Sequence, residues 1–329
     1  MTPFDAVLLI AFGGPHGPDD VRPFLANVLR GRNVPAKRVD DVAHHYELFG
    51  GVSPITALTH KQAAGLQKRL ASTATSVPVY VGMRNWRPFL ADTMMEMSRA
   101  GVRRAVGFIM AAQASYSSCQ QYRENVVEAR AAVQAAGLAD IEVTYVPGWY
   151  AHEGLINANA AHVRRAFEQL PEQLRGGARL IFTAHSIPTR MAQQSQYREQ
   201  LHESSRLVAA RMAAADWALV YQSRSGRPDD PWLGPDICEY LRTVKAEGVQ
   251  AVVLCPIGFV SDHIEVLYDL DHEAADVARE IGLVVTRAEA VNDDPLFLDM
   301  MAEVVVSTIS RYRTGRPLAM LPLDLRRNA

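Results

Sequence analysis

Short apolar runs alternate with amphipathic segments along the whole chain of 329 residues. Eight runs rich in Val, Ile, Leu and Ala are typical of buried strands. These predicted strands cover residues 6–12, 77–82, 105–110, 141–146, 179–184, 217–222, 250–255 and 283–287. Strands that alternate with helices predict parallel sheets with helices on both faces, so we expect an α/β protein.

Between the strands, apolar residues recur three and four positions apart, which predicts helices. These predicted helices cover residues 19–29, 56–70, 88–99, 119–136, 199–213, 235–245, 263–280 and 295–312. The rhythm restarts after a seam near residues 148–176, which indicates two similar halves of about four strands each. We therefore expect domains at 1–160 and 161–315, with the last helix packing back on the first domain and an irregular tail at 316–329.

Composition and charge narrow the class of protein. With 48% apolar and 21% charged residues, the chain is typical of a soluble globular protein. A net charge of −2 gives no general attraction to nucleic acid or anionic lipid. No apolar run is long enough to span a membrane, and no basic residue precedes the first strand as in a signal peptide. Three cysteines without a CxxC pair favour a reducing cytosol over a structural zinc, so we expect a cytoplasmic protein.

In open α/β sheets, ligands bind beyond the carboxyl ends of the strands. His185 ends the run LIFTAH, and Glu265 follows the strand that is expected to lie beside it. The two side chains could therefore reach one site. A histidine at a strand end can also serve only to bond a backbone carbonyl, and that alternative stays open here.

The run GFVSDHIEVLYDLDHE is the most informative segment. On a helix of 3.6 residues per turn, one stripe carries Asp262, Glu265, Asp269, Glu273 and Asp276. Like charges four residues apart destabilise a helix by about 0.2–0.5 kcal/mol per pair, so this row suits a divalent cation better than it suits the helix. The alternative is a solvated face that begins with a capping box.

Motifs for other chemistries are absent. The loop FGGPHG lacks the GxGxxG pattern, no GxxxxGK[ST] occurs, and no GxSxG elbow accompanies Ser186. Cys119 lies near a predicted helix start, where a packed and inert thiol is the favoured interpretation. Nucleotide binding and serine hydrolysis therefore have little support.

Four strings occur in order at long separations: FGGP, TAHSIP, PWLGPD and GFVSDHIEVLYDLDHE. In this order and spacing the chain resembles the ferrochelatases, which insert ferrous iron into a porphyrin. The resemblance runs from Asp5 to about Arg311. It implies two Rossmann-like, chelatase-like domains with a cleft between them. It also implies a porphyrin and Fe(II) as substrates, no required cofactor, and a monomer that contacts neighbouring heme-pathway enzymes transiently.

The resemblance also assigns roles to residues. The matches to the family's iron ligands are His185 and Glu265, and which of them binds iron and which accepts a proton stays open. Asp269 and Glu273 match a proposed proton or metal route. Segment 13–35 matches a mobile lip over the porphyrin. Residues implied to line the porphyrin pocket are Phe12, Arg30, His45, Ser53 and Tyr122.

Three departures from related sequences matter. Many firmicute members have a tyrosine where this chain has Phe12, so no phenolate ligand is available there. His45 and Leu29 stand where those members have arginines. The cysteines that bind a [2Fe–2S] cluster in some relatives are missing. The chain otherwise looks like actinobacterial-type members, which act on coproporphyrin III; the alternatives are protoporphyrin IX, another metal such as cobalt, or a non-catalytic tetrapyrrole carrier.

Overall fold

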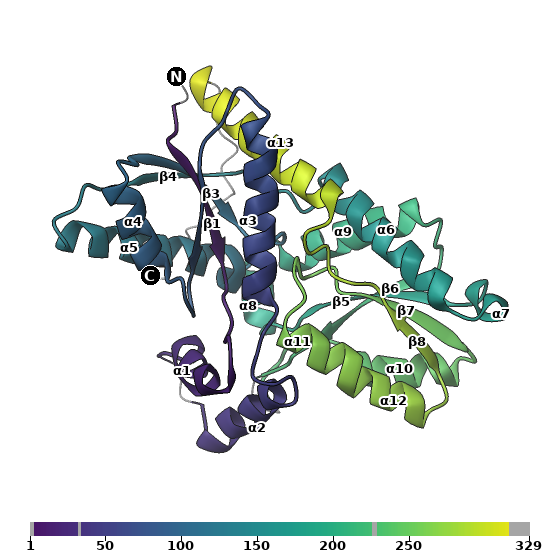
Figure 1. Ribbon diagram of the computed structural model, residues 1–329. Coiled ribbons are helices and arrows are strands. Elements are labelled where there is room, and N and C mark those ends of the chain that lie inside the picture. The colour runs from purple at the N-terminus through teal and green to yellow at the C-terminus, as the bar shows by residue number, and fades with distance from the viewer. Residues whose placement is uncertain (1–2, 32–33, 226–228, 316–329) are drawn as a thin grey trace.

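The computed structural model describes residues 3–31, 34–225 and 229–315, and contains two parallel four-stranded sheets covered by helices (Figure 1). The first sheet has the order β2-β1-β3-β4 and the second β6-β5-β7-β8. The strands are β1 (Ala6–Ala11), β2 (Val79–Met83), β3 (Arg104–Ile109), β4 (Glu142–Tyr145), β5 (Arg179–His185), β6 (Trp217–Gln222), β7 (Ala251–Cys255) and β8 (Val284–Arg287). This confirms the predicted α/β class and all eight predicted strands. The identical strand order makes the two halves similar, as the rhythm predicted.

The first sheet is covered by helices on both faces, and its central strand β1 is apolar and buried at every position. Val7 and Leu9 face α3 (Ile55–Ala71) and α13 (Pro295–Arg313), whereas Leu8 and Ile10 face α4 (Leu90–Arg99) and α5 (Gln121–Ala135). The C-terminal helix α13 therefore returns to the first sheet and packs beside α3 (Figure 1).

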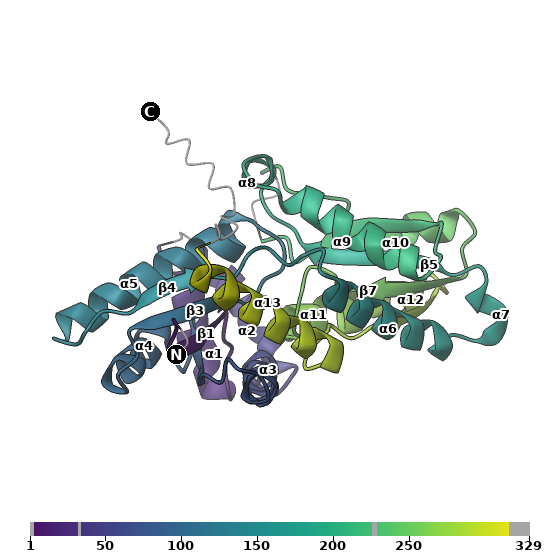
Figure 2. The ribbon, with the colours of Figure 1, turned by 90° about the horizontal axis from the view of Figure 1, so that it is seen from above.

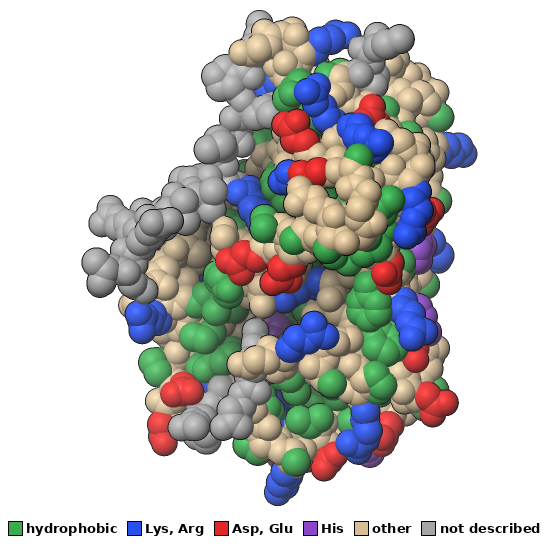
Figure 3. All heavy atoms as spheres, turned by 90° about the vertical axis from the view of Figure 1, so that its left-hand side faces the viewer, with side chains coloured by type: hydrophobic (Ala, Val, Ile, Leu, Met, Phe, Trp, Pro, Cys, Tyr) green, Lys and Arg blue, Asp and Glu red, His purple; other side chains and the backbone are tan. Residues whose placement is uncertain are grey.

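The second sheet follows the same plan. One face packs against α6 (Glu153–Gln169) and α9 (Tyr197–Arg211), and the other against α10 (Ile237–Ala246) and α12 (Ala275–Glu280). Seen from above, the two layered halves lie end to end, with α13 reaching across from the first toward the second (Figure 2). On the face shown in Figure 3, basic side chains are interspersed with acidic ones, in agreement with the near-neutral net charge.

Several helices were not predicted. The seam expected at 148–176 contains α6, whose apolar stripe of Ile156, Ala160 and Val163 is interrupted in sequence by buried Asn159 and His162. The other unpredicted helices are α2 (Ala36–Glu47), α7 (Glu172–Arg175) and α8 (Thr189–Gln193). The predicted irregular tail, 316–329, lies outside the described residues. No helix in the described ranges is long and apolar enough to cross a membrane.

The acidic segment is not one uniform α-helix. It consists of α11 (Ile264–Val266), the π-helical η2 (Leu267–Ala274) and α12. A π-helix bonds each N–H to the carbonyl five residues back, so the expectation of 3.6 residues per turn was wrong in the middle of this segment. Such wide turns are rare and occur frequently at functional sites.

Two short helices join the halves beyond the carboxyl end of β1. These are α1 (Pro18–Val28) and α2, which lie together below the first sheet in Figure 1. Phe24 of α1 and Tyr46 of α2 belong to a buried apolar cluster that also contains Trp86 and Ile264. Ile264, the residue before Glu265, therefore packs against α1, which belongs to the segment that the resemblance describes as a lip.

Candidate active site

His185 ends β5 with one ring nitrogen fixed and the other free. Its Nδ1 lies 2.5 Å from the backbone oxygen of Ser186, and a carbonyl can only accept, so Nδ1 carries the proton. In a neutral imidazole this leaves a lone pair on Nε2. The hydroxyl of Tyr197 donates to the backbone oxygen of His185 at 3.0 Å and holds the strand end in place. The alternative, in which the histidine serves only to bond a backbone carbonyl, accounts for Nδ1 but leaves Nε2 without a role.

Glu265 is delivered to this nitrogen by α11, which follows β7, the neighbour of β5. Its Oε2 lies 3.8 Å from Nε2 of His185 and 3.7 Å from Nε2 of His263. Both distances exceed an ordinary hydrogen bond, so neither imidazole bonds the carboxylate directly. The Glu265 side chain is 45% exposed, which leaves its carboxylate open to a substrate.

His263 was not predicted as a site residue, although it lies within the acidic segment, next to Asp262. It is the N-cap of α11, where its Nδ1 accepts the backbone N–H of Val266 at 3.2 Å. The proton of the neutral ring is therefore on Nε2, facing Glu265. Burial lowers the pKa of His263, which keeps the ring neutral. Position N3 of this helix is Val266, so the capping-box alternative for Glu265 is wrong.

Asp262 is not part of the stripe. Its carboxylate binds Arg287 at 2.9 Å and the side-chain amide of Asn292 at 2.8 Å. A residue from β8, distant in sequence, therefore neutralises the first carboxylate of the row. The pairing could not be predicted from the nearby sequence, in which the first lysine or arginine after Asp262 is Arg279.

Asp269 and Glu273 continue from Glu265 toward the surface. Asp269 is buried, and its Oδ2 accepts hydrogen bonds from the Ser223 hydroxyl and, at 3.3 Å, from the Gln222 amide. Burial, assisted by the charges of Glu265 and Glu273, raises the pKa of Asp269 to about 8. Glu273 is exposed, and partial desolvation together with the nearby Asp236 raises its pKa. The row therefore runs from a buried protonated carboxyl to a surface one.

Phe12 and Tyr122, two predicted pocket residues, are brought together by Arg84. The Arg84 guanidinium lies 5.9 Å from the ring centre of Phe12 and 5.1 Å from that of Tyr122. It donates to Gln121 at 3.1 Å, while its Nε is buried without a partner in the described structure. Arg84 was missed, although it directly follows β2, where the strand-end rule applied to this strand would have found it.

The other predicted pocket residues make separate contacts. Arg30 is exposed and donates to Asn27 at 2.6 Å, and Ser53 is buried with its backbone N–H on Pro15. His45 of α2 stacks on Tyr268 of η2, with ring centres 3.5 Å apart and an interplanar angle of 11°.

The stack continues along η2. Tyr268 also stacks with His272, with centres 5.3 Å apart at 15°. Tyr46, the neighbour of His45, is buried, and burial with the charge of Glu265 raises the pKa of its phenol, which keeps it protonated. None of these aromatic contacts was predicted.

Comparisons with known proteins identify the family. The ferrochelatase family matches residues 4–309. The chain belongs to the ferrochelatase family. A coproporphyrin III ferrochelatase of Streptomyces griseus is 47% identical over 327 residues, covering 95% of this chain and 87% of that protein. A ferrochelatase of Rhodopirellula baltica is 45% identical over 322 residues, covering 98% and 91%. The predicted family is therefore confirmed.

Solved chelatase structures share the fold of this ferrochelatase. SirB from Bacillus subtilis with Fe3+ superposes with a TM-score of 0.59 at 9% identity, covering 95% of this chain and 99% of that one. DR2241 from Deinococcus radiodurans gives 0.53 at 15% identity, covering 92% and 54%. At these identities the likeness concerns the fold alone.

Membership of the family makes the protein a chelatase, an enzyme of the lyase class that inserts ferrous iron into a porphyrin. Such a reaction needs a group that accepts pyrrole N–H protons and a donor atom for iron. The structure brings His185 and Glu265 together, with Asp269 behind them. It also gathers Phe12 and Tyr122 around Arg84.

Proposed function

We propose that this protein inserts Fe(II) into coproporphyrin III to give coproheme in heme biosynthesis, with the His185–Glu265 pair as the reacting groups. The observation that carries the proposal is the free Nε2 of His185 facing the open carboxylate of Glu265 at 3.8 Å. Neutral imidazole and carboxylate both bind Fe(II) and both accept protons near neutral pH.

The two groups divide the work without exchanging a hydrogen bond. Nε2 of His185 holds its lone pair in a fixed direction, because Nδ1 is tied to the Ser186 carbonyl. Such second hydrogen bonds are typical of histidines that ligate metals. The Nε2–H group of His263 points toward the Glu265 carboxylate and stabilises its negative charge. Either group can release iron to the porphyrin while the other takes the two pyrrole N–H protons in turn.

Protons then leave along Asp269 and Glu273. Asp269 lies one turn beyond Glu265 in the wide η2 helix and shares Gln222 with it, since this amide donates to the backbone oxygen of Glu265 and to Oδ2 of Asp269. Glu273 lies one further turn out, at the surface. General base action through such a relay contributes to rate only if each carboxyl can exchange its proton.

The preference for coproporphyrin III rests on charge. This porphyrin has four propionates and protoporphyrin IX has two. Arg84 is a cation with an unpartnered buried Nε between Phe12 and Tyr122, and Arg30 is a further cation on the lip. His45 and Ser53 are the other proposed partners of the porphyrin. A charge-assisted hydrogen bond contributes about 1.5–3 kcal/mol, so two additional arms can discriminate more than tenfold.

The coproporphyrin III ferrochelatases of Streptomyces griseus and Nocardia farcinica, 47% and 46% identical, support this choice. Parallel steady-state assays with both porphyrins, solubilised identically, test it. We expect a higher kcat/KM for coproporphyrin III. A higher value for protoporphyrin IX would overturn the substrate and leave iron insertion in place.

The remaining proposals concern organisation. We propose domains at 1–160 and 161–315, since each range holds one sheet and the boundary falls within α6.

We propose that no [2Fe–2S] cluster is bound, because the three cysteines occupy separate elements and such a centre needs four ligands. Brown colour and inorganic sulfide in purified protein would contradict this. We also propose that the protein is a cytoplasmic monomer that contacts neighbouring enzymes of the heme pathway transiently.

A further inference from the structure

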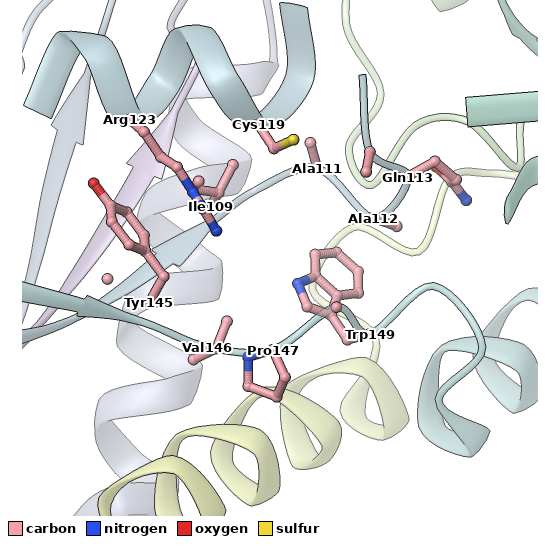
Figure 4. A pocket seen from close by; sticks show the side chains of 13 residues that line it. Ile109, Ala111, Ala112, Gln113, Cys119, Arg123, Tyr145, Val146, Pro147 and Trp149 are labelled. Atoms are coloured by element: carbon pink, nitrogen blue, oxygen red, sulfur yellow. The ribbon is translucent and has the colours of Figure 1, made fainter. Parts of the chain in front are cut away.

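A second pocket lies in the first half, at the carboxyl ends of β3 and β4 and beneath the start of α5 (Figure 4). Its cavity is small, about 30 Å³, and it opens to solvent. Its walls are largely apolar and contain a single charged side chain, Arg123, and no carboxylate. In Figure 4 the Arg123 guanidinium points from α5 into the space between Tyr145 and Trp149.

Arg123 has no partner for its charge in the described part of the chain. Its guanidinium lies over the Tyr145 ring at 4.8 Å, and its buried Nε makes no hydrogen bond. Arg130, two turns further along the same helix, binds Asp140 through two hydrogen bonds of 3.0 and 2.7 Å. Arg287, at the corresponding edge of the second sheet, binds two carboxylates.

The pocket's own polar groups cannot supply the missing charge. Cys119 and Tyr145 are its ionisable neighbours that could become anions. Burial raises the pKa of the Cys119 thiol and that of the Tyr145 phenol, the latter to about 12, so both are neutral near pH 7. The buried Nε of Arg123 has no partner among the described residues, and the planar fork of N–H donors of a guanidinium fits a carboxylate in two parallel bonds.

We infer that this pocket binds a carboxylate, held by Arg123, with a short apolar chain against Ile109 and Trp149. Its position at the strand ends is where α/β sheets bind ligands. The carboxylate could be a free small acid or one arm of the porphyrin, since Tyr122, the residue before Arg123, faces Arg84. The inference does not depend on the proposed function.

Cys119 provides the test, because it lines the pocket, while Cys238 on α10 is an internal control. Alkylation of both thiols by iodoacetamide is followed by peptide mass spectrometry at pH 8.5, in sodium propionate or sodium chloride of equal ionic strength, without porphyrin or iron. We expect propionate to slow Cys119 at least threefold and to leave Cys238 unchanged. Arg123→Gln should lose this protection, whereas Arg130→Gln should keep it.

A second arm identifies the source of the carboxylate. If a porphyrin arm enters the pocket, coproporphyrin III also protects Cys119, and Arg123→Gln raises its Kd at least tenfold. If the ligand is a free acid, only propionate protects and the Kd stays constant. If Arg123→Gln does not fold, Arg123→Lys replaces it, because lysine keeps the charge but lacks the planar fork of N–H donors. No protection by either compound, or equal protection in the Arg123 variants, overturns the inference.

Discussion

The Nε2 atom of His185 and the Oε2 atom of Glu265 face each other across 3.8 Å, with His185 at the end of β5 and Glu265 on α11, which follows the neighbouring strand β7. The gap is too long for a hydrogen bond and leaves both atoms free for a third partner. His185 is held by the carbonyl of its own neighbour, and Glu265 is flanked by the cap of its own helix. The site is thus built from local contacts on two elements that the sheet brings together.

Glu265→Gln should reduce iron insertion by orders of magnitude, with little change in melting temperature. The amide keeps the shape of the side chain but loses the charge that binds iron or a proton, and the residue does not cap α11. Anaerobic turnover and thermal unfolding measure the two effects. Asp276→Asn, an exposed carboxylate on the same segment, is the control and should stay active. A Gln variant of normal rate and lower stability would return Glu265 to a purely structural role.

His263 combines two roles that two substitutions separate. His263→Ala should destabilise the protein by about 1 kcal/mol, within about 0.5–2, because the N-cap is lost. His263→Asn should restore most of that stability, since asparagine is a strong N-cap. Both variants should lower kcat, because neither places an N–H beside Glu265 as the imidazole does. Normal kcat in the Asn variant limits His263 to capping.

Asp269→Asn should change the pH dependence of stability. The folded-state pKa of Asp269 is raised from about 4 to about 8, so its contribution is fully present below pH 4 and is lost as the pH rises through 8. The Asn variant does not ionise, so its melting temperature relative to wild type should rise between pH 5 and pH 9. Melting curves across that range check this, with Asp276→Asn as a flat control. A difference that does not vary with pH rejects a raised pKa.

Much of this architecture follows from the sequence because it depends on short-range patterns. Most of the eight strands are runs of apolar and β-branched residues, the pattern of strands buried on both faces of a parallel sheet. The pairing of His185 with Glu265 was also predictable, because parallel neighbours end at the same edge of a sheet. Helix α6 was missed because polar residues such as Asn159 and His162 satisfy partners within the fold, for example Asp294 for His162.

Long-range contacts explain the other errors. Arg287, which lies 25 positions further along the chain, pairs with Asp262 and removes this carboxylate from the acidic row. His45 matches a family arginine and was expected to line the porphyrin pocket, and in the structure its ring lies against Tyr268. Its stacking on Tyr268 could not be foreseen, because it joins residues more than two hundred positions apart.

Tyr268 should hold helix α2 against the second half. Tyr268→Ala removes two ring contacts, each of about 0.5–1.5 kcal/mol, and should lower the melting temperature and weaken porphyrin binding. Tyr268→Phe keeps both stacks and should behave like wild type. Thermal unfolding and fluorescence titration with coproporphyrin III distinguish the two variants. Equal loss in both would assign the effect to the hydroxyl instead of the stack.

The most direct measurement is an anaerobic absorbance assay of purified protein with Fe(II) and an excess of coproporphyrin III. His185→Ala serves as the paired variant, and circular dichroism shows whether it is folded. We expect many turnovers per wild-type molecule and none above background for folded His185→Ala. Stoichiometric porphyrin binding without turnover would make the wild type a carrier, and a folded His185→Ala variant of near-normal rate would contradict the proposed site.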